Sequence, residues 1–159
     1  MKDLLMDTET AMSVVRNCLV VTLQGELHDD TLMRIRTDIL EKIQATKVRG
    51  MILDLCTVRV LDSFAFNFLA DTARMTSLMG VASVFVGLQP GVVSSLVDLD
   101  VDIDDIHAAL NMEEGFEQMQ NVISIHEDHE DSEDPDNIIT ENDERESDSE
   151  ERWSRGDEG

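Results

Sequence analysis

Basic residues are scarce in this 159-residue sequence. Lysine and arginine together number 12, against 35 aspartates and glutamates, and the formal net charge is -23. A chain with this balance is repelled by phosphate backbones and by anionic lipid surfaces. The sequence therefore predicts no nucleic acid and no membrane among the partners.

Long apolar runs are also missing. No run reaches the roughly 18 residues of a membrane-spanning helix, and the first ten residues, MKDLLMDTET, lack the basic-then-apolar order of a signal peptide. The two cysteines, Cys18 and Cys56, lie in apolar runs without metal-type spacing. We expect both to be reduced core residues of a cytoplasmic protein.

The motifs of the common catalytic sites are absent. Neither G-x-G-x-x-G nor G-x-x-x-x-G-K-[ST] occurs, and no G-x-S-x-G places a serine on a nucleophile elbow. His28 and His107 have no sequence link to a nucleophile, and we interpret them as surface or edge histidines. The acidic segment DLDVDIDDI, residues 98–106, lacks the glycine and the closing glutamate of a calcium loop. The sequence favours a protein that is not an enzyme and has no cofactor or metal.

Acidic residues are concentrated at the C-terminal end. Residues 126–159 hold 16 acidic and 3 basic side chains, with very few large apolar ones. Such a segment buries too little apolar surface to offset the entropy lost on ordering. We therefore predict one folded domain over residues 1–125 and a disordered acidic tail over 126–159.

Hydrophobic periodicity predicts an α/β fold. Two short β-branched runs separated by Asn17 indicate a hairpin, and the apolar runs MILDL and VASVFVGL are typical of buried parallel strands. Asp29 or Asp30 is the expected cap of the first helix, and Gly80 the expected end of the second. Helices are expected over residues 29–46, 63–79, 90–99 and 112–123, and strands near 12–16, 18–23, 51–55, 81–88 and 107–110. This alternation predicts a mixed sheet flanked by about four helices.

Ser63 is the main candidate functional residue. In VLDSFAFNFLA, residues 60–70, Asp62 and Ser63 stand where a strand leads into a helix. One interpretation is an ordinary helix start, since both residue types accept hydrogen bonds from free backbone N–H groups. The other is a phosphorylation site, because the helix dipole and free N–H donors tolerate a phosphate there. Phosphorylation would add roughly -1.5 to -2 charge without melting the helix.

Two phenylalanines near Ser63 suggest a protein contact. Phe68, together with Ala65 and Leu69, already supplies an inward face for this helix. Phe64 and Phe66 lie about 200° apart by helical spacing, so they are not expected to share that face completely. We expect at least one of them to be exposed, and we take Asp62, Phe64 and Phe66 as candidate partner-binding residues.

Four segments resemble a known family in order and spacing. NCLVVTLQGELHDDT, GMILDLCTVRVLDSF, VGLQPGVVSSLVDLDV and IHAALNMEEGF are similar to STAS domains (sulfate transporter and anti-sigma-factor antagonist), over roughly residues 10 to 120. Within the family, they are most similar to the RsbS type, the small component of the bacterial stressosome. The resemblance implies a STAS fold with a phosphorylatable serine at the position of Ser63. It does not extend over the acidic tail.

The resemblance also implies partners. RsbS-type proteins assemble with larger RsbR-like STAS paralogues into a large multi-subunit complex. The complex holds an RsbT-like serine/threonine kinase, which is released when the STAS serine is phosphorylated. A second phosphoacceptor of the related paralogues matches Ser95 here.

Two alternatives stay open from the sequence. One is a STAS module that binds a small ligand or nucleotide through the loops around Ser63 and Pro90. The missing phosphate-loop glycines speak against it. The other is a hydrolase with Ser63 as its nucleophile.

Overall fold

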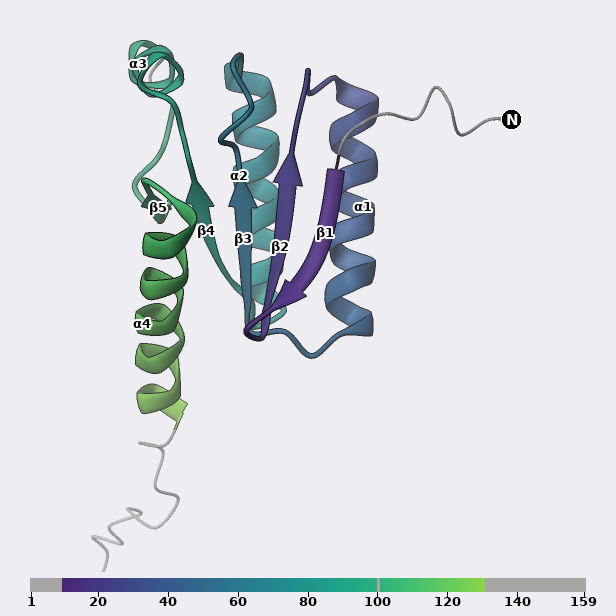
Figure 1. The fold of residues 1–159 in the computed structure, drawn as a ribbon, viewed down its shortest axis with the longest axis vertical. Helices are drawn as coiled ribbons and strands as arrows, with labels where there is room; N and C mark the ends of the chain where they lie inside the picture. The colour runs from purple at the N-terminus through teal and green to yellow at the C-terminus, as the bar shows by residue number, and fades with distance from the viewer. Residues whose placement is uncertain (1–9, 100, 131–159) are drawn as a thin grey trace, which may run out of the picture.

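The protein is built around one five-stranded sheet with helices on both faces (Figure 1). The structure is a computed structural model that describes residues 10–99 and 101–130, without the side chains of residues 126–130. In chain order the elements are β1 (Thr10–Val15), β2 (Cys18–Leu23), α1 (Asp29–Ala45), β3 (Gly50–Asp54), α2 (Ser63–Leu78), β4 (Ala82–Val86), α3 (Pro90–Asp98), β5 (Ala108–Ala109) and α4 (Met112–Glu130). The predicted α/β class and element order are confirmed.

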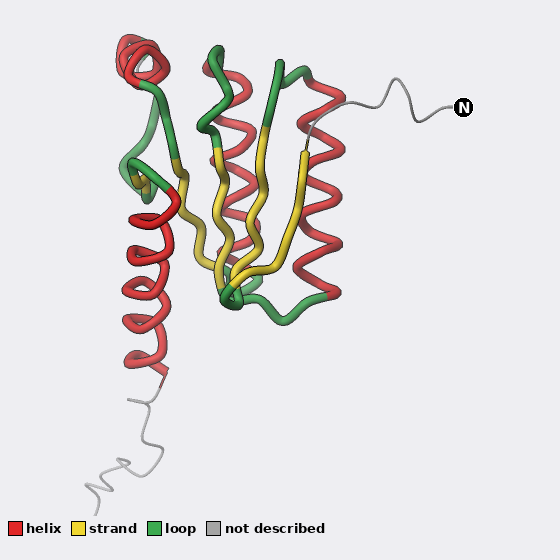
Figure 2. The backbone as a smooth tube through the Cα atoms, viewed as in Figure 1, coloured by secondary structure: helices red, strands yellow, loops and turns green. Residues whose placement is uncertain are grey.

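The sheet is mixed, with spatial order β1-β2-β3-β4-β5 (Figure 2). Only β1 and β2 are antiparallel, and the other neighbours are parallel. Arg16 and Asn17 form the turn between β1 and β2, with φ of 50° and 63°. Two consecutive residues of positive φ are typical of a type I′ hairpin turn, whose twist matches that of the strands. The hairpin predicted at Asn17 is therefore confirmed.

Two apolar layers hold the helices against the sheet. Alternate side chains of β2 and β3 face α1 and α2 in the larger layer, which also contains the α3 residues Val92 and Leu96. The opposite side chains of β2, β3 and β4 pack under α4, whose Met119 is completely buried. The parallel strands are covered on both faces, which explains their continuous apolar sequences.

Two helix boundaries differ from the prediction. The cap residue of α1 is His28, whose side chain makes no capping hydrogen bond, and Asp29 and Asp30 lie in the first turn. The predicted aspartate cap is therefore wrong, although both carboxylates still favour this end of the helix dipole. Helix α4 continues to Glu130, so the first five residues of the predicted tail are helical. Residues 131–159, the rest of that tail, lie outside the described residues.

Burial corrects two of the residue predictions. Phe66 is only 1% exposed, and its ring lies 5.8 Å from that of Phe85 on β4. It is a core residue, so its assignment to a partner-binding surface is wrong. The reason is that β4 extends the core to the side of α2 that bears Phe66. Cys18 is buried as expected, but Cys56 is exposed, because it follows β3 in a loop at the end of the sheet. Within the described residues, no helix is long and apolar enough to cross a membrane.

Phe66 and Phe64 provide a matched test of the core. Phe66→Ala removes a fully buried ring and should lower the free energy of unfolding by about 3 to 5 kcal/mol. Phe64 is 54% exposed, so Phe64→Ala should cost less than about 1 kcal/mol. Urea denaturation of both variants measures the difference, and equal losses would contradict the burial assigned here.

Candidate functional site

The segment between β3 and α2, residues 55–62, is anchored firmly to the fold. Leu55, Val58 and Leu61 are all buried. The hydroxyl of Thr57 donates a 3.0 Å hydrogen bond to the carbonyl of Leu23 at the end of β2. These contacts fix the loop, and the loop therefore positions the start of α2 at the carboxyl edge of the parallel strands.

Ser63 is the first residue of α2 and is half-buried. Asp62 is the cap residue, and its Oδ1 accepts a 2.7 Å hydrogen bond from the N–H of Ala65. The first interpretation of this sequence, an ordinary helix start, is confirmed for Asp62. The hydroxyl of Ser63 has no hydrogen-bond partner among the described residues. The Ser63 side chain is therefore not used to hold the helix start together.

Exposed apolar side chains flank Ser63. Val60, near the end of the loop, is 76% exposed, and Phe64 is 54% exposed. The ring of Phe64 lies 6.2 Å from that of Phe68, which is half-buried. The exposure predicted for one of the two phenylalanines is therefore found at Phe64. Val60 and Phe64 are thus exposed apolar residues that stand before and after Ser63 in the sequence.

Arg36 fixes this part of α2 against α1. Its guanidinium lies 3.6 Å from the centre of the Phe68 ring and donates to the carbonyl of Phe68 at 3.1 Å and to the hydroxyl of Thr72 at 3.0 Å. The cation–π contact and the two hydrogen bonds all attach Arg36 to the turn of α2 that runs from Phe68 to Thr72. Phe68 is therefore held by Arg36 while Phe64, one turn earlier, projects from the helix.

A second loop, between β4 and α3, packs against the first. Gly87 has a φ of 76°, and a Cβ there would lie 2.9 Å from the Cα of Cys56 and closer still to its Sγ. The side-chain amide of Gln89 donates to the carbonyl of Cys56 at 3.1 Å. Only glycine allows both this conformation and this approach. The two loops thus form one unit at the carboxyl edge of the sheet.

The thiol of Cys56 is not activated by this environment. Its hydrogen bond to the Asp54 carboxylate, followed by desolvation and the charge of Asp54, raises the pKa of Cys56 to about 11. Thiolate is the nucleophilic form of cysteine, and it is scarce at neutral pH when the pKa is this high. The thiol of Cys56 is therefore a poor nucleophile at neutral pH.

Ser95, the second predicted phosphoacceptor, lies on α3. It is exposed, and its hydroxyl donates a 2.9 Å hydrogen bond to the carbonyl of Gly91. Helix α3 lies at the same end of the sheet as the start of α2 (Figure 1). The hydroxyl of Ser95 is therefore hydrogen-bonded within its own helix, whereas the hydroxyl of Ser63 is not.

His28 and the acidic segment, the other candidates from the sequence, have their own interaction partners outside this site. The Nε2 of the exposed His28 lies 3.3 Å from the carboxylate of Glu26. In the acidic segment, Asp105 forms two hydrogen bonds with Arg74 of α2, at 2.9 and 3.0 Å. Over the part of the chain that the structure describes, histidine, cysteine and acidic side chains form no group of three suited to a metal ion.

A comparison with protein-family models matches residues 9–115 to the STAS domain. The match covers more than half of the chain. The chain belongs to the STAS-domain family. Its five-stranded mixed sheet with four helices is the STAS fold, and the loop that carries Ser63 lies within the matched region.

Solved STAS structures share this fold. The RsbS protein of Moorella thermoacetica is 23% identical, with a TM-score of 0.64 over 72% of this chain and 97% of that one. A component of the stressosome, described as a signal integration and transduction hub, is 26% identical, with a TM-score of 0.62 over 70% of this chain and 97% of that one.

The curated relatives include RsbRD of Bacillus subtilis, named as an RsbT co-antagonist protein. It is 23% identical over 87 residues, which are 55% of this chain. The alignment spans only 31% of RsbRD. The similarity to this relative is therefore that of one STAS domain to part of a longer protein.

Sequence reasoning missed several residues that position this STAS site. The Gln89 bond and the Gly87 approach join two loops distant in sequence, and Arg36 acts from another helix. The glycine and the glutamine stand together in the segment VGLQP. That segment carried part of the family resemblance, but nothing local in it shows which loop it contacts.

Gly87 should not tolerate a side chain. Gly87→Ala adds a Cβ where φ is positive and where Cys56 occupies the space, so we expect the free energy of unfolding to fall by about 2 to 4 kcal/mol. Gly91→Ala is the control, since Gly91 lies in α3 with nothing within 4 Å of its added Cβ. That variant should be neutral or slightly stabilising. Thermal unfolding distinguishes the two, and a neutral Gly87→Ala would refute the close contact.

Asp54 should control the reactivity of Cys56. Alkylation by iodoacetamide should rise with pH toward an inflection near 11, the raised pKa of Cys56. Asp54→Asn removes the negative charge, so the inflection should move down toward the ordinary thiol value and alkylation at pH 8 should be at least about tenfold faster. Mass spectrometry of the tryptic peptide separates Cys56 from the buried Cys18. An unchanged pH profile would show that Asp54 does not raise the pKa of the Cys56 thiol.

Proposed function

We propose that this protein is a non-enzymatic scaffold and antagonist of a stressosome-type complex in the cytoplasm. It binds an RsbT-like serine/threonine kinase and releases it when Ser63 is phosphorylated. Larger RsbR-like STAS paralogues are its expected partners in the complex. The observation that carries the proposal is a half-buried serine with an unpaired hydroxyl at the first position of a capped helix, between the exposed side chains of Val60 and Phe64.

The chemistry of this position suits a reversible charge. A phosphate at the start of α2 is attracted by the positive end of the helix dipole and by backbone N–H groups of the first turn. Asp62 already satisfies the N–H of Ala65, so the cap remains when the phosphate is added. The modification therefore changes the surface charge by roughly -1.5 to -2 while the helix stays formed.

The surroundings explain how that charge acts on a partner. Interfaces place aromatic and apolar side chains at their centres, where charge is costly to bury. Val60 and Phe64 provide such a centre, and Asp62 provides a polar rim beside it. A phosphate between them adds an unpaired charge to any interface that covers them, and the bound kinase then dissociates.

The relatives support an antagonist role. RsbRD is named for antagonism involving RsbT, and one solved relative is a component of the stressosome. Ser63 lies within the residues matched to the STAS domain. Ser95, which matches the second phosphoacceptor of related paralogues, is exposed at the same end of the sheet, but its hydroxyl is hydrogen-bonded to the carbonyl of Gly91. We therefore propose Ser63 as the phosphoacceptor of the RsbT-like kinase, and phosphorylation of Ser95 stays a separate prediction.

Phosphorylation of the purified protein tests the proposal directly. We expect incubation with the cognate RsbT-like kinase and ATP to give one phosphate on wild-type protein, located at Ser63 by mass spectrometry. Ser63→Ala should lose it, and Ser95→Ala should keep it. Calorimetry should show that Ser63→Asp binds the kinase at least about tenfold more weakly, a loss of about 1.4 kcal/mol. Ser95→Asp is the matched control and should bind with nearly wild-type affinity.

Two results would contradict the proposal. One is unchanged phosphorylation of Ser63→Ala, which would place the modification elsewhere. The other is full kinase binding by Ser63→Asp together with full binding by Phe64→Ala, which would place the interface on another surface. Circular dichroism of each variant confirms that the fold is kept.

A further inference from the structure

The outer edge of β1 is open along its length. Figure 1 shows β1 at one side of the sheet, and among the described residues β2 is the strand that pairs with it. Its six residues, TAMSVV, include no charged residue, proline or glycine. Natural edge strands often carry a lysine or a proline, because unpaired backbone groups otherwise pair with another strand. The sequence of β1 therefore lacks the features that prevent edge-to-edge pairing.

Alternate backbone groups of β1 point away from β2. Val15 and Cys18 flank the two-residue turn of the hairpin, and residues in that position form a hydrogen-bonded pair. The direction of the backbone groups alternates along a strand. The N–H and C=O groups of Thr10, Met12 and Val14 therefore point outward, and they are evenly spaced around Met12.

The side chains of these three residues lie on the α1 face of the sheet. Their partners on β2 all belong to the apolar layer that faces α1 and α2, and Met12 packs against that layer. Val14 is nevertheless 46% exposed. The open edge thus presents apolar surface together with its free backbone groups.

A groove of about 450 Å³ separates this edge from α1. Thr10 and Met12 line it on the strand, and Asp38, Glu41 and Lys42 line it on the helix. The three charged side chains have no ion-pair or hydrogen-bond partner among the described residues. The groove therefore joins an apolar strand edge to a row of charges of both signs.

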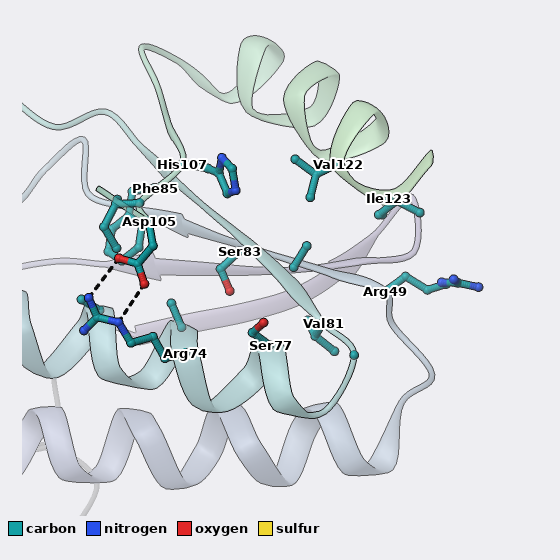
Figure 3. A pocket seen from close by; sticks show the side chains of 15 residues that line it. Arg49, Arg74, Ser77, Val81, Ser83, Phe85, Asp105, His107, Val122 and Ile123 are labelled. Carbon is teal, nitrogen blue, oxygen red and sulfur yellow. Dashed lines mark hydrogen bonds and ion pairs between the residues drawn. The ribbon is translucent and has the colours of Figure 1, made fainter. Parts of the chain in front are cut away.

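The opposite edge of the sheet, at β4, is not accessible in this way. Strand β5 pairs with Phe85 and Val86. Figure 3 shows Ser83, which precedes them, recessed between Ser77 of α2 and Val122 of α4. Helices on both faces of that strand keep a second sheet at a distance. At β1, by contrast, the helix α1 lies on one face, and α4 packs against β3, β4 and β5 instead.

A second copy of the chain is the partner that fits the β1 edge. A twofold axis makes the two β1 strands antiparallel, and an axis beside Met12 places Thr10 of each copy opposite Val14 of the other. Each outward N–H and C=O group of these residues then has a partner. The outward groups are symmetric about their central residue, as pairing of a strand with its own copy requires.

Charge favours the same antiparallel arrangement. The twofold axis sets the two α1 helices side by side in opposite directions, so Asp38 and Glu41 of each copy approach Lys42 of the other. A parallel arrangement in register would instead place Lys42 beside Lys42. Exposed ion pairs add little affinity, but they select the orientation of an interface.

We propose that two copies of this protein associate through β1, antiparallel about Met12, so that their two sheets become one continuous sheet. Val14 of each copy packs into the groove beside Thr10 of the other, and Asp38 pairs with Lys42 across the axis. The start of α2 lies at the carboxyl edge of the parallel strands, away from β1 (Figure 1). Each dimer therefore presents two Ser63 surfaces.

Analytical ultracentrifugation of the full-length protein tests this proposal. Over about 1 to 500 µM, the monomer should give way to a species of twice its mass. Val14→Glu places a negative charge beside the acidic residues of the other copy, and it should weaken the association at least about tenfold. Val93→Glu is the matched control, because Val93 on α3 is 41% exposed and lies on the other side of the sheet from β1. This variant should associate as the wild type does.

Exchange of the charges tests the orientation. Lys42→Glu should weaken the dimer, whereas Asp38→Lys/Lys42→Asp keeps opposite charges on the facing helices and should restore it. Amide hydrogen exchange followed by NMR locates the interface. The amides of Met12 and Val14 should exchange more slowly as the protein concentration rises, and the amide of Ser83 should exchange equally at all concentrations. Circular dichroism confirms that each variant keeps the fold.

Four results would overturn the proposal. The first is a wild type that stays monomeric over the whole concentration range. The second is equal association of the Val14→Glu and Val93→Glu variants, which would place the interface elsewhere. The third is a charge-exchanged variant as weak as Lys42→Glu, and the fourth is exchange of the Met12 amide that does not depend on concentration. None of these results depends on Ser63 phosphorylation or on the kinase.

Discussion

The contact between Gly87 and Cys56 is the constraint on which the site depends. Two loops from neighbouring parallel strands meet there so closely that no Cβ fits, and the Gln89 side chain adds a hydrogen bond across the same junction. The backbone bond from Leu55 to Val86 continues this pairing from the strands into the loops. Because the first loop leads into α2, this junction determines where Ser63 emerges.

The firmly packed loop before α2 fits the proposal that Ser63 acts by gaining a phosphate charge. The residues that hold the loop face inward, namely Leu55, Val58 and Leu61, whereas the residues beside the serine face outward. We therefore expect that the proposed phosphate on Ser63 would displace none of these three buried side chains. Under the proposed function, the two states of the protein would differ in the surface offered to a partner, and the helix dipole and first-turn N–H groups would stabilise the charged state.

Features encoded locally could be predicted from the sequence. The hairpin at Asn17, the Asp62 cap and the Gly80 helix end each depend on residues within a few positions, and all three are confirmed. The α/β class followed from the alternation of apolar runs. The phosphorylation of Ser63 stays a prediction, because its position and exposure permit the reaction without showing it.

Features set by tertiary packing could not be predicted in this way. Helical spacing separated Phe64 from Phe66, but only the position of β4 shows that Phe66 is the buried one. Cys56 has apolar neighbours in sequence, yet the strand ends before it and leaves it exposed.

The most direct measurement of the central claim compares amide NMR spectra of the unmodified protein and the protein phosphorylated at Ser63. The account predicts shifts confined to residues 55–67 and 87–91, with the amides of Phe85 and Met119 unchanged. Shifts throughout the β4 and α4 amides would contradict it, because the phosphate would then alter the core rather than the surface.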